Sequence, residues 1–196
     1  MIKSNFFAFI ARMKLIKRWA LMNNTIKENI AEHSLQVAMF AQMLVVLHNK
    51  HFAEDEKLLN PETAAVIAMY HDVTEVITGD MPTPIKYFNK GISTTYKEIE
   101  NLAAVKISNM LPEDIRGSFS KYILVNNEYK KYEPYIKAAD KLSAFVKCIE
   151  EIRMGNDEFE KAKQTIKHSL SVMNMPEVDM FIETFIPAFS LTLDEL

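Results

Sequence analysis

An adjacent histidine and aspartate, His71 and Asp72, are the first residues in this sequence whose types suggest chemistry. A neutral imidazole nitrogen and a carboxylate oxygen are both good ligands for a divalent first-row metal ion. Such a pair also arises by chance, so alone it is weak evidence. Glu75 follows four residues after His71, and on a helix this spacing places a second acid on the same face. The segment 68–80 therefore predicts a metal-binding helix that runs into a polar turn.

Two further candidate ligands lie elsewhere in the chain. His33 begins an amphipathic segment after a polar turn, and Asp140 stands among apolar residues expected to pack. Together with His71 and Asp72 they form a set of two histidines and two aspartates. Such a mixed nitrogen and oxygen site favours manganese, cobalt, iron or zinc and leaves coordination positions open. An open position suits activation of water and polarisation of a phosphoryl oxygen, as hydrolysis of a phosphomonoester requires.

Arg18 and Trp19, the only tryptophan, form a second notable pair. The planar guanidinium of Arg18 has the geometry for bidentate capture of a terminal phosphate. A cation at a helix end is an ordinary alternative for Arg18, and a place in the core is one for Trp19. Next to each other, they could bind a phosphate and enclose the attached sugar or base.

Helices throughout are needed to position these residues. Only four glycines and seven prolines occur in 196 residues, and apolar residues recur at spacings of three and four. We therefore expect an all-α fold, a helical bundle forming one domain over residues 1–196. The predicted helices run from a cap at Ser4 to Arg18 and Trp19, from 30 to 49, from Asn60 and Pro61 through His71, Asp72 and Glu75, from a Thr95/Glu98 capping box to 111, from 112 over a short stretch, from 134 to 155, from 157 to 173 and from 176 to 185.

Some details of these elements can be tested against a structure. The apolar face of the helix over 30–49 is expected to carry Leu35, Met39, Met43 and Val46, while residues 78–84 should form an ordered loop because two prolines interrupt a helix there. The aromatic segment 180–189 is either a last layer of core or a subunit contact.

Composition excludes several classes of function. A net charge of −3 gives no basic field of the kind that binds a nucleic-acid polymer. The uncharged stretch 34–49 is shorter than the ~20 apolar residues that span a bilayer. One cysteine, Cys148, cannot form an internal disulfide and is expected to be buried. We expect a soluble, cytoplasmic protein that does not bind membranes.

The order and spacing of the four candidate ligands resemble the pattern H…HD…D of the HD-domain metal-dependent phosphohydrolases. Within that superfamily the chain resembles the bacterial 5′-deoxynucleotidases over nearly its whole length. The matching segments are Arg-Trp at 18–19, Glu-His-Ser-Leu-Gln-Val-Ala at 32–38, Tyr-His-Asp at 70–72, Gly-Asp-Met-Pro-Thr-Pro-Ile-Lys-Tyr at 79–87 and Lys-Ala-Ala-Asp at 137–140.

The resemblance implies an all-helical, usually dimeric enzyme that removes the 5′-phosphate from deoxyribonucleoside monophosphates with one divalent metal ion. Carried over by motif, the metal ligands would be His33, His71, Asp72 and Asp140. Glu75 and Arg18 would be catalytic. The implied substrate contacts are Arg18, Trp19, Asp72, Asp80, Met81, Pro82, Thr83 and Asp140.

We further hypothesise how the site prefers a deoxyribose. Asp80 would accept a hydrogen bond from the sugar 3′-hydroxyl, while the Trp19 indole would occupy the volume that a 2′-hydroxyl needs. An apolar wall alone gives only ~10²-fold discrimination against an added hydroxyl, so a second fixed contact is useful. Asp80 and Thr83 could instead stabilise the loop.

Two alternative functions stay open. The same ligands could serve a nucleoside triphosphate or cyclic nucleotide hydrolase, although the sequence has no dense basic cluster beyond Arg18, Lys86 and Lys90. The protein could also be a metal-containing nucleotide sensor without turnover, but such a module has no need for a proton-handling acid at Glu75.

Overall fold

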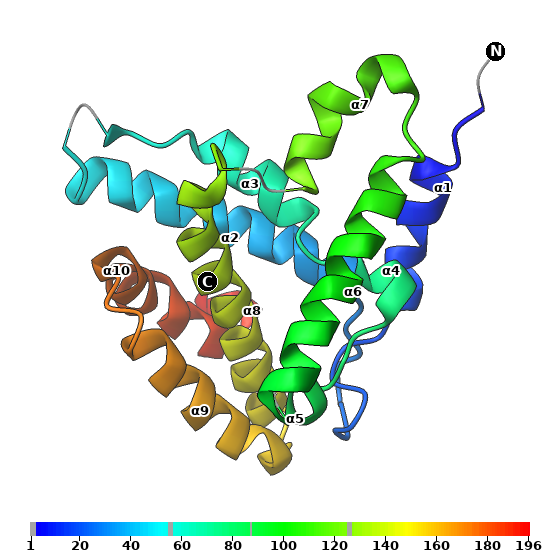
Figure 1. Ribbon diagram of the computed structural model, residues 1–196. Helices are drawn as coiled ribbons and strands as arrows, with labels where there is room; N and C mark the ends of the chain where they lie inside the picture. The colour runs from blue at the N-terminus through cyan, green and yellow to red at the C-terminus, as the bar shows by residue number, and fades with distance from the viewer. Residues whose placement is uncertain (1–2, 55–56, 87, 125–126) are drawn as a thin grey trace.

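The computed structural model describes residues 3–54, 57–86, 88–124 and 127–196, and in these ranges the chain is helical with no strands (Figure 1). The predicted all-α fold is therefore confirmed. Short 3₁₀ helices at Ala11–Leu15, Ser120–Tyr122, Lys130–Tyr132, Asp157–Phe159, Ile186–Ser190 and Leu193–Glu195 link or follow the α-helices. The α-helices are α1 (Phe6–Ile10), α2 (Ile30–His51), α3 (Pro61–Met69), α4 (Glu75–Thr78), α5 (Thr83–Lys86), α6 (Lys90–Ser108), α7 (Glu113–Phe119), α8 (Glu133–Arg153), α9 (Glu160–Ser171) and α10 (Pro176–Phe185).

Helix α2 is the central element and packs against α3, α8 and α10. Its apolar stretch is long enough, by length and composition, to cross a membrane, contrary to the expectation from residues 34–49. A helix that is apolar on most sides is also what the middle of a bundle requires, because neighbours cover several of its faces. The residues that α2 buries against those neighbours are Val37, Ala38, Ala41, Leu44 and Val45.

The predicted apolar face of α2 was wrong. Leu35, Met39 and Val46 are 55%, 54% and 42% exposed, and Met43 is only partly buried. Because α2 carries apolar residues around most of its circumference, spacing alone could not identify the side that packs inward. The outer side forms an apolar stripe instead.

Two hydrophobic cores lie on either side of the His71–Asp72 segment. The larger core joins α2, α3, α8 and α10 and includes Ala68, just before the segment. The smaller core contains Val73, just after the segment, and joins it to the N-terminal helices and the end of α6. Burial of residues on both sides fixes the backbone from 68 to 73 in place.

The N-terminal region forms a shorter helix than predicted. Helix α1 ends at Ile10, a 3₁₀ helix follows, and the backbone of Ile16 is extended. Lys17 then makes an isolated antiparallel bridge with Asn29. Ser4 does bond the Phe6 amide through its hydroxyl, but the residue that precedes the helix is Asn5. Arg18 consequently lies in a bridged extended segment.

Other helix starts test the capping signals directly. The Asn60 side chain accepts a hydrogen bond from the Thr63 amide at 2.6 Å, which confirms the predicted start of α3. The predicted capping box at Thr95 and Glu98 was wrong: α6 begins earlier, with the Asn89 side chain bonding the Ile92 amide at 2.9 Å. The predicted loop over 78–84 is shorter than expected, because α4 includes Thr78 and α5 begins at Thr83.

The C-terminal half follows the sequence-based boundaries closely, with α8, α9 and α10 in the expected places. Cys148 is fully buried, as predicted, and burial raises the pKa of its thiol to about 12. Phe181 is 3% exposed and packs in the larger core, so the aromatic segment 180–189 supplies core in part.

Candidate active site

His71 and Asp72 do not lie inside a helix, which corrects the prediction that one helix carries them together with Glu75. Helix α3 ends at Met69. The turns that follow have 3₁₀-type hydrogen bonds, which join residues three apart, such as His71 N to Ala68 O at 3.3 Å. The His71 ring also donates from Nδ1 to the Ala68 carbonyl at 2.6 Å. This carbonyl would otherwise accept the next helical bond, so the side chain competes with helix continuation.

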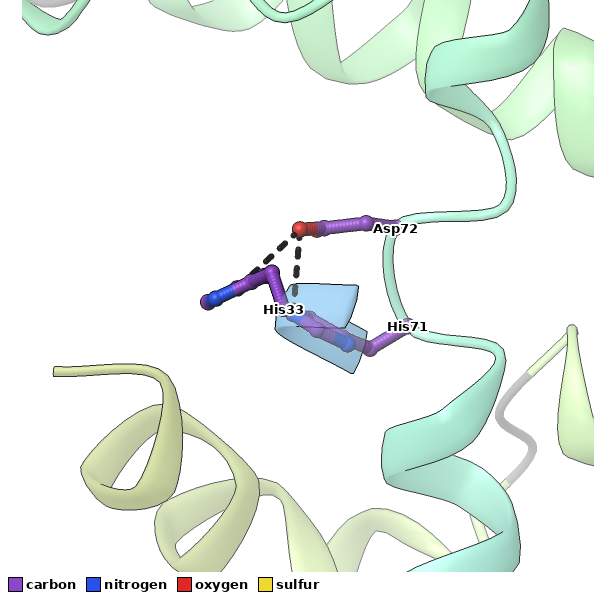
Figure 2. Close-up of side chains that lie close together, drawn as sticks. All are labelled: His33, His71 and Asp72. Atoms are coloured by element: carbon purple, nitrogen blue, oxygen red, sulfur yellow. Dashed lines mark ion pairs between the residues drawn. The ribbon is translucent and has the colours of Figure 1, made fainter. Parts of the chain in front are cut away.

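Four predicted metal ligands come together from three parts of the chain. His33 comes from the first turn of α2, His71 and Asp72 from the turn after α3, and Asp140 from α8. Asp72 Oδ2 lies 3.5 Å from His33 Nε2 and 3.2 Å from His71 Nε2. Dashed lines mark these two ion pairs in Figure 2. His33 Nε2 lies 3.1 Å from Asp140 Oδ1. Possible ligand atoms of His33, His71 and Asp72 all lie within 4.8 Å of one another.

The two histidines are oriented by hydrogen bonds on their far nitrogens. Ser143 donates its hydroxyl hydrogen to Gln36 Oε1 at 2.6 Å, so its oxygen accepts the bond from His33 Nδ1 at 3.0 Å. His71 Nδ1 donates to Ala68 O. Both Nε2 atoms are buried, and neither makes a hydrogen bond to any of the described residues. Metal ligation by histidine requires a ring nitrogen turned toward the site and the opposite nitrogen anchored, and both rings have this arrangement.

Charge at this cluster is distributed unevenly. Burial disfavours the charged form of His71, but Asp72 outweighs burial and raises the pKa of His71 to about 9. Burial also opposes ionisation of Asp72, yet the neighbouring His71, His33 and Arg18 hold its pKa well below the usual range. Burial lowers the pKa of His33 despite Asp140 nearby, so this ring stays neutral near pH 7.

Arg18 joins this cluster from the bridged N-terminal segment. Its Nη1 lies 3.4 Å from Asp72 Oδ2 and its Nη2 lies 4.0 Å from Asp140 Oδ1, while Nε donates to Glu28 Oε2 at 3.1 Å. Burial lowers the pKa of Arg18, but the three carboxylates outweigh burial and raise it above its usual value. Arg18 is therefore a permanent cation beside the predicted metal ligands.

Glu75 begins α4 and is 7% exposed. Its Oε2 atom is buried and has no hydrogen-bond partner in the part of the chain that the structure describes. Burial, with added repulsion from Asp72 and Asp80, raises the pKa of Glu75 to about 9. A buried carboxyl that keeps its proton at neutral pH, next to strongly ionised groups, is the usual physical sign of an acid or base in catalysis.

The predicted substrate contacts lie nearby. Trp19 is half-buried next to Arg18, and its indole Nε1 donates to Glu28 Oε2 at 2.9 Å. Asp80 is half-buried in the loop after α4; burial raises its pKa, and Arg18 is the strongest cation acting on it. Met81 and Pro82 are half-buried in the same loop, and the side chain of Thr83 lies outside the described part of the structure. The roles of these residues remain predictions.

Three residues that support this site were not predicted from the sequence. Glu28 contacts both Arg18 and Trp19, while Ser143 and Gln36 orient His33. Gln36 lies three residues after His33 on α2, and Ser143 lies three residues after Asp140 on α8. A search for polar residues one turn from each predicted ligand could have found Gln36 and Ser143. No local pattern marks Glu28, since only the folded chain brings it next to Arg18.

A family model and curated relatives match nearly the whole chain. The model of the YfbR-like 5′-deoxynucleotidase family matches residues 5–189. Curated relatives named 5′-deoxynucleotidase include one from Vibrio atlanticus, 47% identical over all of both chains, and one from Erwinia tasmaniensis, 46% identical over all of this chain and 98% of the relative.

Solved structures support the fold. An HD-domain phosphohydrolase from Listeria innocua has a TM-score of 0.74 at 21% identity, covering 94% of this chain and 88% of that one. A cyanophage S-2L HD phosphohydrolase, bound to dA and one catalytic Zn²⁺, has a TM-score of 0.58 at 19% identity, covering 95% and 98%.

The predicted family and enzyme class are confirmed by full-length relatives. His33, His71 and Asp72 form a cluster that can hold the predicted divalent metal ion. The chain belongs to the YfbR-like 5′-deoxynucleotidase family.

Proposed function

We propose that this protein hydrolyses deoxyribonucleoside 5′-monophosphates to a deoxyribonucleoside and phosphate at the cluster around Asp72. One observation carries the proposal. Two histidines present buried, unbonded Nε2 atoms to the same Asp72 oxygen, and Arg18 lies at the edge of that cluster. This arrangement combines a metal site with a cation for the phosphate, and the family to which the chain belongs is named for that reaction.

The metal ligands in this proposal are His33, His71, Asp72 and Asp140. Two imidazoles and two carboxylates would hold manganese, cobalt, iron or zinc and leave positions open. When bound, such an ion polarises phosphoryl oxygens and lowers the pKa of water.

Arg18 binds the phosphate in this mechanism. Its guanidinium is permanently charged, and its two Nη groups point toward the ligand carboxylates Asp72 and Asp140. Planar donors in that position suit bidentate contact with phosphate oxygens and offset their charge during transfer. Arg18 thus orients the phosphorus atom for attack by water.

Glu75 handles the proton. Its pKa is about 9 without a metal ion, and a nearby cation brings such a value down toward neutrality. A carboxyl with a pKa near the working pH is most effective as a general acid. Glu75 therefore donates a proton to the 5′-oxygen as the bond from phosphorus to that oxygen breaks.

Selectivity for deoxyribose comes from Trp19 and Asp80. Asp80 accepts a hydrogen bond from the 3′-hydroxyl, and the Trp19 indole occupies the space that a 2′-hydroxyl would need. A ribonucleotide then cannot seat without moving its phosphate away from Arg18, and a displacement of about 1 Å can cost ~10²-fold in rate.

The direct test is phosphate release by purified protein with manganese or cobalt. The substrates are dAMP, AMP, dADP, dATP and a cyclic nucleotide. We expect release from dAMP to exceed release from AMP by at least ~10²-fold in kcat/KM, and the other compounds to react more slowly. Preferred turnover of dATP or of the cyclic nucleotide would support the alternative hydrolases, and binding without turnover would support the sensor.

We also propose that the protein is a cytoplasmic homodimer that pairs through the outer face of α2. Leu35, Met39 and Val46 form an exposed apolar stripe there. Next to it lies an apolar groove between α2 and the C-terminal helices, and a second copy would cover both surfaces. The groove is lined by Met39, Phe40, Met43, Phe181, Phe185 and Phe189.

A further inference from the structure

We propose that Glu28 is a positioning residue that holds Arg18 and Trp19 in one fixed relation, and so couples phosphate binding to sugar selection. The inference deepens the proposed function and rests on it. A single carboxylate oxygen, Glu28 Oε2, accepts hydrogen bonds from Arg18 Nε at 3.1 Å and from Trp19 Nε1 at 2.9 Å. No substrate atom needs to touch Glu28 for this role.

The bond to Arg18 sets the direction of the guanidinium. With Nε–H donated to Glu28, the two Nη groups lie on the opposite edge, toward Asp72 at 3.4 Å and Asp140 at 4.0 Å. The Glu28 and Arg18 side chains are 14% and 13% exposed, so water screens this charge-assisted bond only weakly. Without Glu28 the guanidinium would be free to rotate against those carboxylates.

The bond to Trp19 fixes the indole at its polar edge. The Trp19 backbone has φ +58°, a left-handed conformation that a bulky residue adopts only when its surroundings hold it there. The Asn24 side chain donates to the Trp19 carbonyl at 3.0 Å, and the indole packs against Phe159 with ring centroids 5.3 Å apart. Glu28 supplies the remaining contact, at the indole N–H.

Glu28 is itself held rigidly by the backbone. The Arg18 amide donates to the Glu28 carbonyl at 3.1 Å, next to the bridge between Lys17 and Asn29. Asn29 then caps α2, accepting hydrogen bonds from the first amides of the helix. Glu28 therefore stands at a fixed point from which a short side chain reaches both partners.

This geometry predicts a coupled defect when Glu28 is removed. In Glu28→Ala, Arg18 and Trp19 lose their shared acceptor, so kcat/KM for dAMP should fall by ~10²-fold, as for a displacement of about 1 Å. The ratio of dAMP to AMP activity should fall by about tenfold or more, because a mobile indole no longer excludes the 2′-hydroxyl. Glu28→Gln keeps an oxygen with two lone pairs, and its ratio should stay within about threefold of wild type.

The only tryptophan gives a readout that does not depend on activity. Fluorescence anisotropy and acrylamide quenching both report on Trp19 directly. Glu28→Ala should lower the anisotropy and increase the quenching, while Glu28→Gln should return both to their wild-type values. Glu32→Ala is the matched control, since Glu32 is exposed and lies four residues further along the chain. It should leave both readouts and the ratio unchanged.

The outcomes separate this inference from the proposed function. A wild-type protein without deoxynucleotidase activity defeats the proposed function, whereas the fluorescence still tests the contact. An active wild type with an unchanged dAMP/AMP ratio in Glu28→Ala overturns the positioning role. Equal losses on both sugars, with unchanged Trp19 fluorescence, overturn it as well. The positioning role is supported if Glu28→Ala lowers both the dAMP/AMP ratio and the Trp19 anisotropy and Glu28→Gln recovers both.

Discussion

At the scale of single residues, the site depends on unequal environments for similar groups. Asp72 and Glu75 are both carboxyls in a small volume, yet the neighbouring His71, His33 and Arg18 keep the pKa of Asp72 low while burial raises that of Glu75 to about 9. Separation of pKa values between neighbouring acids assigns them different tasks, one as a charged ligand and the other as a proton carrier. The two roles follow from position, because one faces cations and the other faces carboxylates.

The raised pKa of Glu75 predicts a pH dependence of stability in chelator-treated protein. A carboxyl with a pKa of about 9 when folded and 4.5 when unfolded contributes stability that is fully present below pH 4.5 and lost as pH rises toward 9. A pKa difference of one between the folded and unfolded states corresponds to about 1.4 kcal/mol of stability. Glu75→Gln has no such group, so its melting temperature should rise relative to that of wild type between pH 5 and pH 9, by ~2–4 °C for each kcal/mol that wild type loses.

Thermal unfolding of both proteins across that range checks this prediction. His71 also has a pKa raised to about 9 and titrates in the same window, but it is present in both proteins and largely cancels in the difference. A gap between the two melting temperatures that stays constant with pH would show that Glu75 is ionised in the folded protein.

At the scale of elements, the sequence predicted most helices because capping and periodicity are local. Asn60 and Pro61 begin α3 as expected, and α8 to α10 lie where spacing placed them. Two kinds of error have physical causes. The His71 side chain bonds the Ala68 carbonyl where α3 ends, and α6 is capped by Asn89 instead of Thr95. Competing caps and side-chain bonds to the backbone are decided by tertiary packing.

The candidate site was predictable where chemistry requires particular residue types in an order. His33, His71, Asp72 and Asp140 were found by motif, and the structure brings them within contact distance. Residues that support the site carry no such pattern. The role of Glu28 could not be predicted from the sequence, because it depends on the antiparallel bridge that places residues 17 and 29 side by side. Its partner Trp19 was identified, but not the bond that holds it.

Helix α8 links the site to the rest of the fold. Lys147 and Glu151 form a buried ion pair on it, and Glu151 accepts hydrogen bonds from the Thr25 and Ile26 amides at 2.8 and 2.9 Å. The same helix carries Asp140 and Ser143. The loop that follows Trp19 is therefore anchored to the element that provides a predicted metal ligand.

At the scale of the whole molecule, the outer face of α2 predicts a dimer. Met39→Glu places a charge in the exposed apolar stripe and should convert the protein to monomers, because an unpaired charge is costly in an apolar interface. Light scattering after size exclusion should give twice the 22.6 kDa chain mass for wild type and the single mass for the variant.

Leu102→Glu is the control for this test. Leu102 is 70% exposed on α6, away from the proposed contact, so the variant should keep the wild-type mass. A monomeric wild type, or a Met39→Glu protein that stays dimeric, would contradict the assignment of this face.

The central claim is that one metal ion at His33, His71, Asp72 and Asp140 is required for removal of a 5′-phosphate. The most direct measurement titrates metal-depleted protein with manganese or cobalt while phosphate release from dAMP is followed. Activity should be absent without metal, rise in proportion to added ion and level off at about one equivalent per chain; Asp140→Asn, with unchanged helical content, should bind the ion more weakly and stay inactive. Full activity in the metal-depleted protein, or an Asp140→Asn titration identical to wild type, would contradict the claim.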